Sequence, residues 1–505
     1  MEALDTANSV RTVTRLLRDA SDCYGDRAAI RYVSDGAIRE HSYRDLYRDS
    51  LRGCGAIQQR FPAGTHIALI GKTSYRYLIA LNAVMMSGCT AVPLAADAPT
   101  EETIRLLRDS DAAVIFYDET LRDAENVFLA CPLLRDRFGL NAYPLEMLPA
   151  PETATPREIP EGCAAIIYTS GSTGVRKGAM LTSGAIVSNV CFKEMTFEGG
   201  HVALNVLPMH HIFSFSCDYL KNLKDGVTVC LNSRLSALGE ELLLFEPTVL
   251  RLVPAIIDSL LRRVRILRKR DPSLSPRAAA ERVFGRRLRN IIVSGASYSA
   301  ANDAEFQEMG ITIRQGYGMT ETGPRIAVPD GGTCAASGGR IISICRVRLQ
   351  NGEIQVKSPS LMTGYYKREE ETKQAFTEDG WFRTGDIGRI TEDNELFITG
   401  RLKNVIILPN GENVSPEEIE LRYAAEPLVK EIEVFEHKGR IAAEIVPDRD
   451  YAARMGMDAE DAVRALVEEK NAADIAAREI EDITFRDQPL EKTETGKLKR
   501  RKWTL

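Results

Sequence analysis

Short apolar segments alternate with amphipathic segments over much of this chain, and this alternation constrains the fold more than any other feature. Apolar segments of strand length occur at residues 67–70, 91–94 and 113–117, and helical patterns begin near Ser74 and Thr100. Strands separated by single helices are typical of parallel sheets whose faces are covered by those helices. The first part of the chain is therefore predicted to form a doubly wound α/β layer.

The same rhythm returns after residue 160. Its apolar segments are residues 202–206, 227–231, 248–252 and 291–293. They predict a second doubly wound layer. Between about residues 340 and 400 the pattern changes to short runs separated by turns, such as 354–356 and 395–398, which predicts a small β-rich unit.

A compact α+β segment is expected after this unit. Its first helix is indicated by Ser415-Pro416-Glu417-Glu418, where serine is a typical N-cap, proline suits the first helical position and glutamate the third. Residues 400–403 are the predicted linker. We therefore expect a large N-terminal domain at residues 1–401 and a small mobile C-terminal domain at residues 402–505.

Length and composition are those of a globular protein with more than one domain. The chain has 505 residues, of which 44% are hydrophobic and 27% charged. No run of 18 or more apolar residues occurs, and the start of the chain, MEALD, has neither the basic nor the apolar region of a signal peptide, so we expect a cytoplasmic protein without integral membrane association. The ten cysteines are spread without a C-x-x-C pair, which is typical of reduced core thiols.

The charge distribution argues against a nucleic-acid partner. The net charge is −6, although eleven Lys or Arg residues fall between residues 262 and 289 and more lie at residues 497–502. Basic runs without interleaved aromatic residues usually form solvated helix faces. Residues 262–289 are predicted to be an exposed amphipathic helix pair, broken at Asp271-Pro272.

The most specific motif follows the apolar run at residues 164–167. Residues 168–178 read YTSGSTGVRKG and contain three glycines, four Ser or Thr side chains and two cations. Glycines let several backbone N–H groups approach one anion, and hydroxyls and cations add to the attraction. A P-loop would need a hydroxyl residue after the lysine. The sequence thus predicts another kind of phosphate loop, with the candidate ligands Thr169, Ser170, Gly171, Ser172, Thr173, Gly174 and Lys177.

Five further motifs follow this loop in order. They are LPMHH at 207–211, QGYGMTETG at 315–323, WFRTGD at 381–386, GRLKN at 400–404 and KTETGK at 492–497. Together the six motifs resemble those of the adenylate-forming (AMP-binding) superfamily, most closely bacterial acyl-CoA synthetases of the long-chain-fatty-acid–CoA ligase type. The resemblance implies ATP, Mg²⁺ and coenzyme A as cofactors or co-substrates, and a small carboxylic acid that becomes an acyl-adenylate and then a thioester.

The resemblance also implies roles for residues of the nucleotide site. Glu321 would bind Mg²⁺ together with the substrate phosphates, and Thr320 would donate to the α-phosphate. Asp386 would bind the ribose hydroxyls with support from Arg401. The adenine would lie against Tyr317, Gly318, Gly295, Ala296 and Ser297.

Three more residues are assigned in the same way. His211 would form a wall of the carboxylate pocket. Lys497 would be the catalytic cation of adenylation, because its charge can stabilise the transition state once the small domain closes. Lys403 would be the hinge on which that domain turns.

The chain also departs from the family pattern. His210 fills a position that is more often aromatic, and Asp218 and Tyr219 follow where fatty-acid members commonly have a small residue, so the acid's chain length stays open. The Phe-Asp motif of amino-acid-activating domains is absent from residues 207–214. Ile407 stands where luciferase-like enzymes carry lysine.

Two alternatives to CoA ligation remain. One is a stand-alone enzyme that loads the phosphopantetheine thiol of an acyl or peptidyl carrier protein. The other is a catalytically silent nucleotide-binding regulatory protein. The presence of Glu321, Asp386, Arg401 and Lys497 favours an active enzyme over the second alternative.

Overall fold

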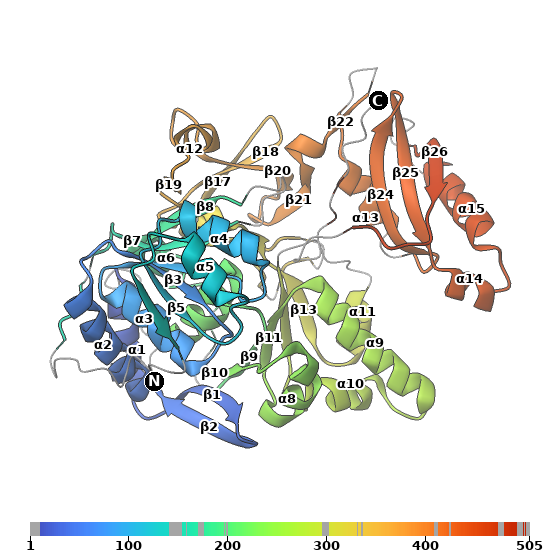
Figure 1. Cartoon of the computed structure of the whole chain (residues 1–505). Helices are drawn as coiled ribbons and strands as arrows, with labels where there is room; N and C mark the ends of the chain where they lie inside the picture. Colours follow the sequence, from blue (N-terminus) through green and yellow to red (C-terminus); the bar gives the residue numbers. More distant parts are fainter. Residues whose placement is uncertain are drawn as a thin grey trace.

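The chain forms six β-sheets within the residues that its structure, a computed structural model, describes. Two large sheets and two small ones make up the body from the N-terminus to β21, and two further small sheets belong to the C-terminal part, as Figure 1 shows. The described residues are 11–140, 154–157, 159–169, 176–195, 197, 200–294, 302–330, 332–334, 337–408, 413–423, 426–472, 479–491, 498 and 500.

The first large sheet has the strand order β19-β8-β7-β4-β3-β5-β6. Its strands are β3 (His66–Ile70), β4 (Thr90–Leu94), β5 (Val114–Tyr117), β6 (Asp136–Gly139), β7 (Cys163–Tyr168), β8 (Gly178–Thr182) and β19 (Gly364–Tyr365). Strands β3 to β7 pair in parallel, whereas β8 and β19 are antiparallel to their neighbours. The three predicted strands lie within one residue of β3, β4 and β5.

Helices connect these strands as the alternation predicts. They are α3 (Tyr75–Met86), α4 (Thr100–Asp109), α5 (Ala124–Ala130) and α6 (Ser183–Ser188). Helix α3 begins near the predicted position because the Ser74 hydroxyl accepts a hydrogen bond from the Tyr77 N–H at 3.2 Å. All but one of the α3 residues are buried, so this helix lies inside the molecule.

The second large sheet has the order β13-β12-β11-β9-β10-β1-β2 and is parallel except for the β1–β2 hairpin. Its strands are β1 (Ala28–Ser34), β2 (Ala37–Ser42), β9 (Val202–Asn205), β10 (Thr228–Leu231), β11 (Val249–Leu252), β12 (Asn290–Val293) and β13 (Thr312–Gln315). The second doubly wound layer is thus confirmed. Its helices include α1 (Val13–Tyr24), α2 (Tyr43–Arg60), α7 (Lys221–Lys224), α8 (Leu238–Phe245) and α11 (Asp303–Glu308).

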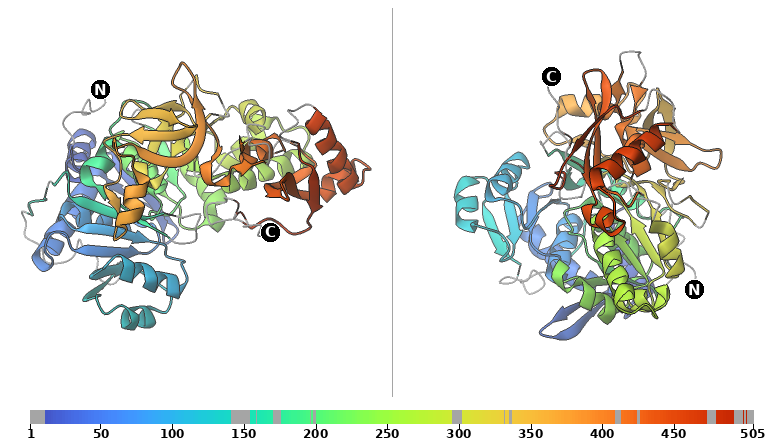
Figure 2. Two further views of the ribbon diagram at one scale, coloured as in Figure 1. Left: turned by 90° about the horizontal axis from the view of Figure 1, so that it is seen from above. Right: turned by 90° about the vertical axis from the view of Figure 1, so that its right-hand side faces the viewer.

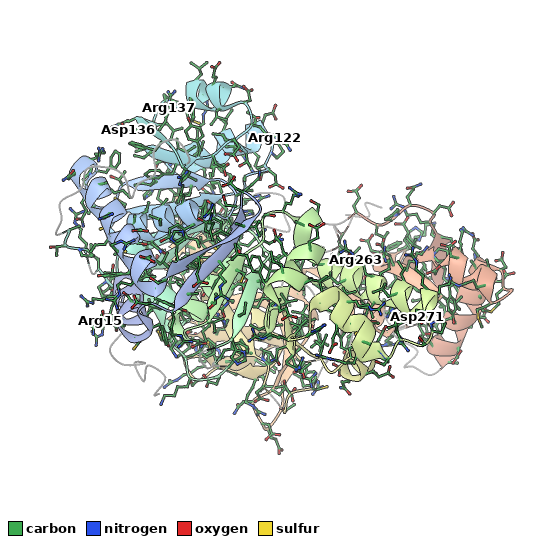
Figure 3. The ribbon with its side chains drawn as sticks, turned by 90° about the horizontal axis from the view of Figure 1, so that it is seen from below. Arg15, Arg122, Asp136, Arg137, Arg263 and Asp271 are labelled. Atoms are coloured by element: carbon green, nitrogen blue, oxygen red, sulfur yellow. The ribbon has the colours of Figure 1, made fainter. Side chains whose placement is uncertain are left out.

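The basic helix pair is confirmed as well. Helix α9 (Pro254–Arg270) and helix α10 (Pro276–Phe284) flank the predicted break. Helix α9 buries Ile257, Leu260, Leu261 and Val264, and its last turn carries three cations, which suits the negative end of the helix dipole. Figure 3 labels Arg263 on this helix and Asp271 just after it.

One hydrophobic core joins the two large sheets. It contains Leu69 of β3, Val229 of β10 and the buried faces of α1, α2 and α3. The π-helix η2 (Phe213–Leu220) also packs into it, and the Tyr219 hydroxyl exchanges hydrogen bonds with the Asn82 amide of α3 at 2.8 and 3.1 Å. The segment after His211 is therefore held in the middle of the molecule.

A β-rich unit follows, as predicted. Strands β17 (Arg346–Gln350), β18 (Glu353–Lys357), β20 (Phe382–Ile390) and β21 (Leu396–Arg401) form an antiparallel sheet. A three-stranded sheet contains β14 (Tyr317–Gly318), β15 (Arg325–Val328) and β16 (Arg340–Ile341), and helix α12 spans Glu369–Ala375. Gly400 and Arg401 belong to β21, so half of the predicted linker is strand.

The C-terminal part has its own core, with Ile419, Val434, Ile445 and Val463 among its buried residues. It lies to one side of the larger body in the left view of Figure 2 and in front of that body in the right view. Its elements are β22 (Ile406–Ile407), β23 (Asn413–Val414), α13 (Pro416–Tyr423), β24 (Val429–His437), β25 (Arg440–Pro447), α14 (Arg449–Arg454), α15 (Ala459–Ala472) and β26 (Asp482–Phe485). The predicted fold class is confirmed, whereas the boundary at residue 401 stays a prediction.

Two predictions from composition can be compared with this fold. All ten cysteines are free, and seven of them are buried. None of the helices in the described ranges is both long and apolar enough to span a bilayer.

Candidate active site

The base of the predicted phosphate loop is a closed connection between two antiparallel strands. Tyr168 of β7 lies opposite Gly178 of β8, and the Thr169 N–H donates to the Lys177 carbonyl oxygen at 2.9 Å. The loop therefore leaves and returns at the same end of the sheet. Several predicted ligands lie outside the described residues, and their roles stay predictions: Ser170, Gly171, Ser172, Thr173, Gly174, Gly295, Ala296, Ser297 and Lys497.

Both cations of this loop are placed by neighbouring elements. The Arg176 Nε lies 2.6 Å from the Glu102 Oε1 of α4. The Lys177 Nζ lies 5.0 Å from the centre of the Tyr365 ring, a cation–π contact. Arg176 thus has a carboxylate partner, while Lys177 faces β19.

Glu321 lies in the 3₁₀ turn η5 (Thr320–Thr322), which Thr320 begins. Directly before this turn, a Cβ on Gly318 would lie only 1.7 Å from the Pro324 carbonyl oxygen, so only glycine fits there. The Glu321 carbonyl oxygen accepts from the Met362 N–H at 2.8 Å. The turn is therefore held firmly by the chain after β18.

The Glu321 side chain is oriented by a residue that sequence reasoning did not identify. The Tyr365 hydroxyl donates to the Glu321 Oε1 at 2.7 Å. Burial and the nearby Glu321 carboxylate raise the pKa of Tyr365 far above its usual value, so the phenol stays a neutral donor. One tyrosine therefore contacts both the loop cation Lys177 and the candidate magnesium ligand.

Asp386 and Arg401 lie opposite each other on β20 and β21. The Arg401 Nε is 2.9 Å from the Asp386 Oδ1, and the Tyr317 hydroxyl donates to the Asp386 Oδ2 at 2.7 Å. Burial, and then Asp386, raise the pKa of Tyr317 well above its usual value. Among the described residues each carboxylate oxygen has one polar partner, so each keeps a lone pair that could accept from a hydroxyl.

The two histidines of the LPMHH motif lie side by side, with ring centres 4.1 Å apart. Burial lowers the pKa of His210 well below its usual value, and His211 lowers it further, so His210 is neutral near pH 7. The His211 carbonyl oxygen accepts from the Phe215 N–H at 3.0 Å, which joins the motif to the π-helix η2.

Asp218 does not present a free charge to a substrate channel. Its Oδ1 lies 3.3 Å from the Arg251 Nη1, and its Oδ2 accepts from the Asn205 amide at 2.9 Å. Both side chains of the ion pair are almost completely buried. Burial raises the pKa of Asp218, while Arg251 opposes that rise. The acidic residue that departs from the family pattern thus belongs to a buried polar network that joins η2 to β9 and β11.

Lys403 lies in the 3₁₀ turn η6 (Leu402–Asn404) between the two parts of the molecule. Burial, and then Arg401, lower the pKa of Lys403. The helix predicted at Ser415 begins at Pro416, and the Ser415 hydroxyl donates to the Thr399 carbonyl oxygen of β21 at 2.7 Å. The hinge candidate therefore lies beside contacts that join the two parts.

Arg500 fixes the chain three residues after Lys497. Its guanidinium contacts the Glu420 carboxylate at 2.7 Å and donates to the Val434 carbonyl oxygen at 3.0 Å. The sequence shows a cluster of basic residues at 497–502, and at Arg500 the chain is attached to α13 and β24. The pairing of one cation of the tail with Glu420 could not be read from the motif.

The described residues contain no group of three or more His, Cys, Asp or Glu side chains that could hold a metal ion. Glu321 is thus not part of such a group. Mg²⁺ is usually held by one or two carboxylates together with substrate phosphates, so the arrangement fits that ion.

Comparisons with known proteins agree with this geometry. Residues 17–366 match the family model "AMP-binding enzyme", and residues 403–504 match "AMP-binding enzyme C-terminal domain". Long-chain-fatty-acid–CoA ligase FadD15 of Mycobacterium tuberculosis is 27% identical over 439 residues, which are 75% of this chain and 72% of that protein. Feruloyl-CoA synthase of an Amycolatopsis species is 30% identical over 382 residues, covering 71% and 72% of the two chains.

A solved structure is similar over almost the whole chain. ATP-bound MatB from Rhodopseudomonas palustris is 25% identical, with a TM-score of 0.80 and coverage of 96% of this chain and 97% of that one. The fold, the motifs and the family models agree. This chain belongs to the AMP-binding enzyme family of acid–CoA ligases.

Proposed function

We propose that this enzyme activates a carboxylic acid with ATP and Mg²⁺, releases pyrophosphate, and transfers the acyl group from AMP to coenzyme A. One observation carries the proposal. The hydroxyl of Tyr317, only four residues before Glu321 in the chain, donates to Asp386, and the Tyr365 side chain contacts both Glu321 and Lys177. The candidate ribose, magnesium and phosphate ligands thus belong to one connected site.

The chemistry explains why these groups occur together. A carboxylate repels nucleophiles and lacks a good leaving group, and a mixed anhydride with AMP overcomes both obstacles. Lys177 places positive charge beside the loop proposed to hold the β- and γ-phosphates. Glu321 would bind Mg²⁺ through one carboxylate, and the ion would neutralise phosphate charge as pyrophosphate leaves.

The small domain supplies the remaining cation. Lys497 would neutralise charge shared by the substrate carboxylate and the α-phosphate, an effect of about 3 kcal/mol for comparable single donors. Arg500, three residues later in the chain, is attached to α13 and β24. Rotation about Lys403 would remove Lys497 before the thiol attacks.

A fatty acid is the first substrate class to test. The similarity to FadD15, a protein named long-chain-fatty-acid–CoA ligase, supports this choice, and the similarity to a feruloyl-CoA synthase requires aromatic acids in the panel. The neutral His210 beside His211 suits an uncharged wall more than an anion-attracting one.

The test is a pyrophosphate-release assay with aliphatic, aromatic and amino acids. Each active acid is then incubated with coenzyme A or with a carrier protein bearing phosphopantetheine, and the thioester is identified by mass spectrometry. Acid-dependent pyrophosphate release with acyl-CoA as the product supports the proposal. If a thioester forms on the carrier protein alone, the carrier protein and not CoA is the acceptor. If none of the acids stimulates pyrophosphate release, the proposed activity is rejected.

A further inference from the structure

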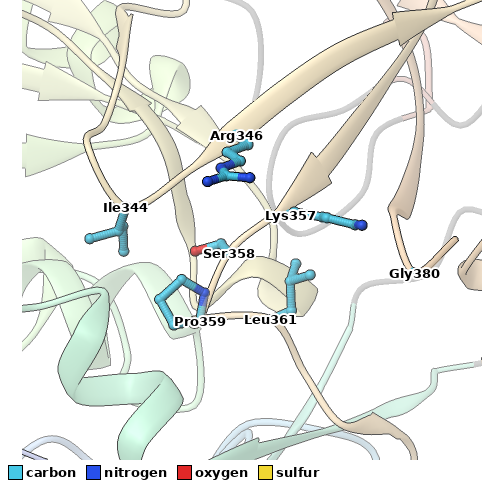
Figure 4. A pocket seen from close by; sticks show the side chains of 7 residues that line it. All are labelled: Ile344, Arg346, Lys357, Ser358, Pro359, Leu361 and Gly380. Carbon is cyan, nitrogen blue, oxygen red and sulfur yellow. The ribbon is translucent and has the colours of Figure 1, made fainter.

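A pocket lies beside the four-stranded sheet, and none of its lining residues is assigned to the nucleotide. Its volume is about 380 Å³, at the lower end of the range for small-molecule sites. Figure 4 shows its lining residues, which include two cations and no carboxylate. They are Ile344, Arg346, Lys357, Ser358, Pro359, Leu361 and Gly380.

The two cations of this pocket occupy positions at which like charges repel each other. Arg346 of β17 lies directly opposite Lys357 of β18 in the antiparallel register. Like charges at directly opposite positions destabilise a sheet. In Figure 4 their charged ends diverge, with Lys357 extending toward Gly380.

The neighbouring cation on the same face shows how such a charge is usually satisfied. Arg348 forms a two-pronged ion pair with Asp379 at 2.7 and 3.1 Å. Within the described part of the chain, no carboxylate forms an ion pair with Arg346 or Lys357, and the Lys357 Nζ lies 5.1 Å from the centre of the Trp381 ring. The pocket therefore holds two cations without a protein counter-charge.

We infer that this pocket binds the phosphate group of a small organic phosphate. If both side chains turned toward one anion, each would gain a charge-assisted contact, and the planar fork of Arg346 suits phosphate oxygens. Ile344, Pro359 and Leu361 supply an apolar wall for the organic part of the ligand.

Hydrogen bonds connect the floor of this pocket to the candidate active site. The Ser360 hydroxyl donates to the Thr322 carbonyl oxygen at 2.8 Å, so its oxygen accepts from the Ser358 hydroxyl, also at 2.8 Å. Thr322 ends the turn that carries Glu321. A phosphate bound at Arg346 and Lys357 would thus touch the segment that supports this turn.

Calorimetric titration of the full-length protein with inorganic phosphate, at constant ionic strength, tests the site by binding alone. The double variant Arg346→Gln/Lys357→Gln is expected to weaken one binding event by about tenfold or more. Arg389→Gln removes a cation of the same sheet outside the pocket and should leave that event unchanged. Lys177→Ala should also preserve it, which separates this pocket from the nucleotide loop.

Stability and ligand source give independent readouts. Without phosphate, the double variant should melt at the wild-type temperature or above it, because a repulsion is removed. Titration of the wild type and of the double variant with coenzyme A and with 3′-dephospho-coenzyme A identifies the source of the phosphate. If the double substitution weakens the binding of coenzyme A alone, the pocket binds the 3′-phosphate. If both proteins bind the two ligands with equal affinity, the pocket binds free phosphates. Unchanged phosphate binding in the double variant, or complete loss in Lys177→Ala, would overturn the inference.

Discussion

The hydroxyl of Tyr365 donates a hydrogen bond to the carboxylate of Glu321 across 2.7 Å, although 44 residues separate the two in sequence. The contact joins β19, at the edge of the first large sheet, to the turn η5. The Lys177 Nζ lies over the ring of the same tyrosine. The Tyr365 side chain therefore links the orientation of Glu321 to the base of the phosphate loop.

Tyr365→Phe is expected to weaken Mg²⁺ binding without unfolding the protein. The ring and its contact with Lys177 remain, but Glu321 loses the donor that orients it. Loss of such an outer partner commonly weakens metal binding about tenfold or more. The concentration of Mg²⁺ that gives half-maximal pyrophosphate release measures this effect. Tyr366→Phe is the control, since its hydroxyl donates instead to Asp111 at 2.8 Å; an equal effect in both variants would contradict the assignment.

Asp386→Asn is expected to reduce recognition of the ribose. The amide keeps the size of the side chain but loses the charge and one pair of acceptor sites. We expect the KM for ATP to rise about tenfold and the preference for ATP over 2′-deoxy-ATP to disappear. Kinetics with both nucleotides measure the ratio. A variant that discriminates as the wild type does would exclude Asp386 from ribose binding.

Asp218→Leu is expected to lower the free energy of unfolding by about 3–5 kcal/mol, because Arg251 is left buried without its counter-charge. The Nε and Nη2 of Arg251 already have no partner among the described residues, so further loss is costly. Urea unfolding gives the value. Adding Arg251→Met should restore much of the stability, and Glu370→Gln in the exposed pair with Lys373 should change it little. A double variant less stable than Asp218→Leu would count against this explanation.

His210 is expected to make the protein less stable as the pH falls below about 6.5. Its pKa is lowered in the folded chain, so below that pH the unfolded chain binds a proton that the folded chain does not. The free energy of unfolding therefore falls with decreasing pH, by up to about 1.4 kcal/mol per pH unit for one group. His210→Phe should remove this contribution when unfolding is measured between pH 7 and pH 5. An unchanged slope in His210→Phe would refute the prediction.

The elements that were predictable are those with local signals. Strands β3, β4 and β5 are apolar runs bounded by helix starts, and α9 and α10 are separated by an Asp-Pro break. No such local signal shows which sheet the strands β1 and β2 join. Strand β1 joins the second sheet by pairing with β10, about two hundred residues later, and the segment pattern contains no information on that pairing.

The candidate site shows the same division. The motifs identified Glu321, Asp386 and Arg401, because each lies in a short characteristic stretch. Tyr365 was missed, since only the three-dimensional contact with Glu321 distinguishes it from other tyrosines. Asp218 was noticed as unusual, but its partner Arg251 lies on β11, and the neutralisation of its charge could not be inferred from its own segment.

Acid-dependent exchange of labelled pyrophosphate into ATP, measured for the wild type and Lys497→Ala, tests the central claim most directly. The account predicts exchange by the wild type with at least one acid and a loss of about 10²-fold or more in the variant. It also predicts that the variant still converts supplied acyl-adenylate and coenzyme A to thioester. Wild-type protein that exchanges pyrophosphate with no acid, or a variant that loses both steps equally, would contradict it.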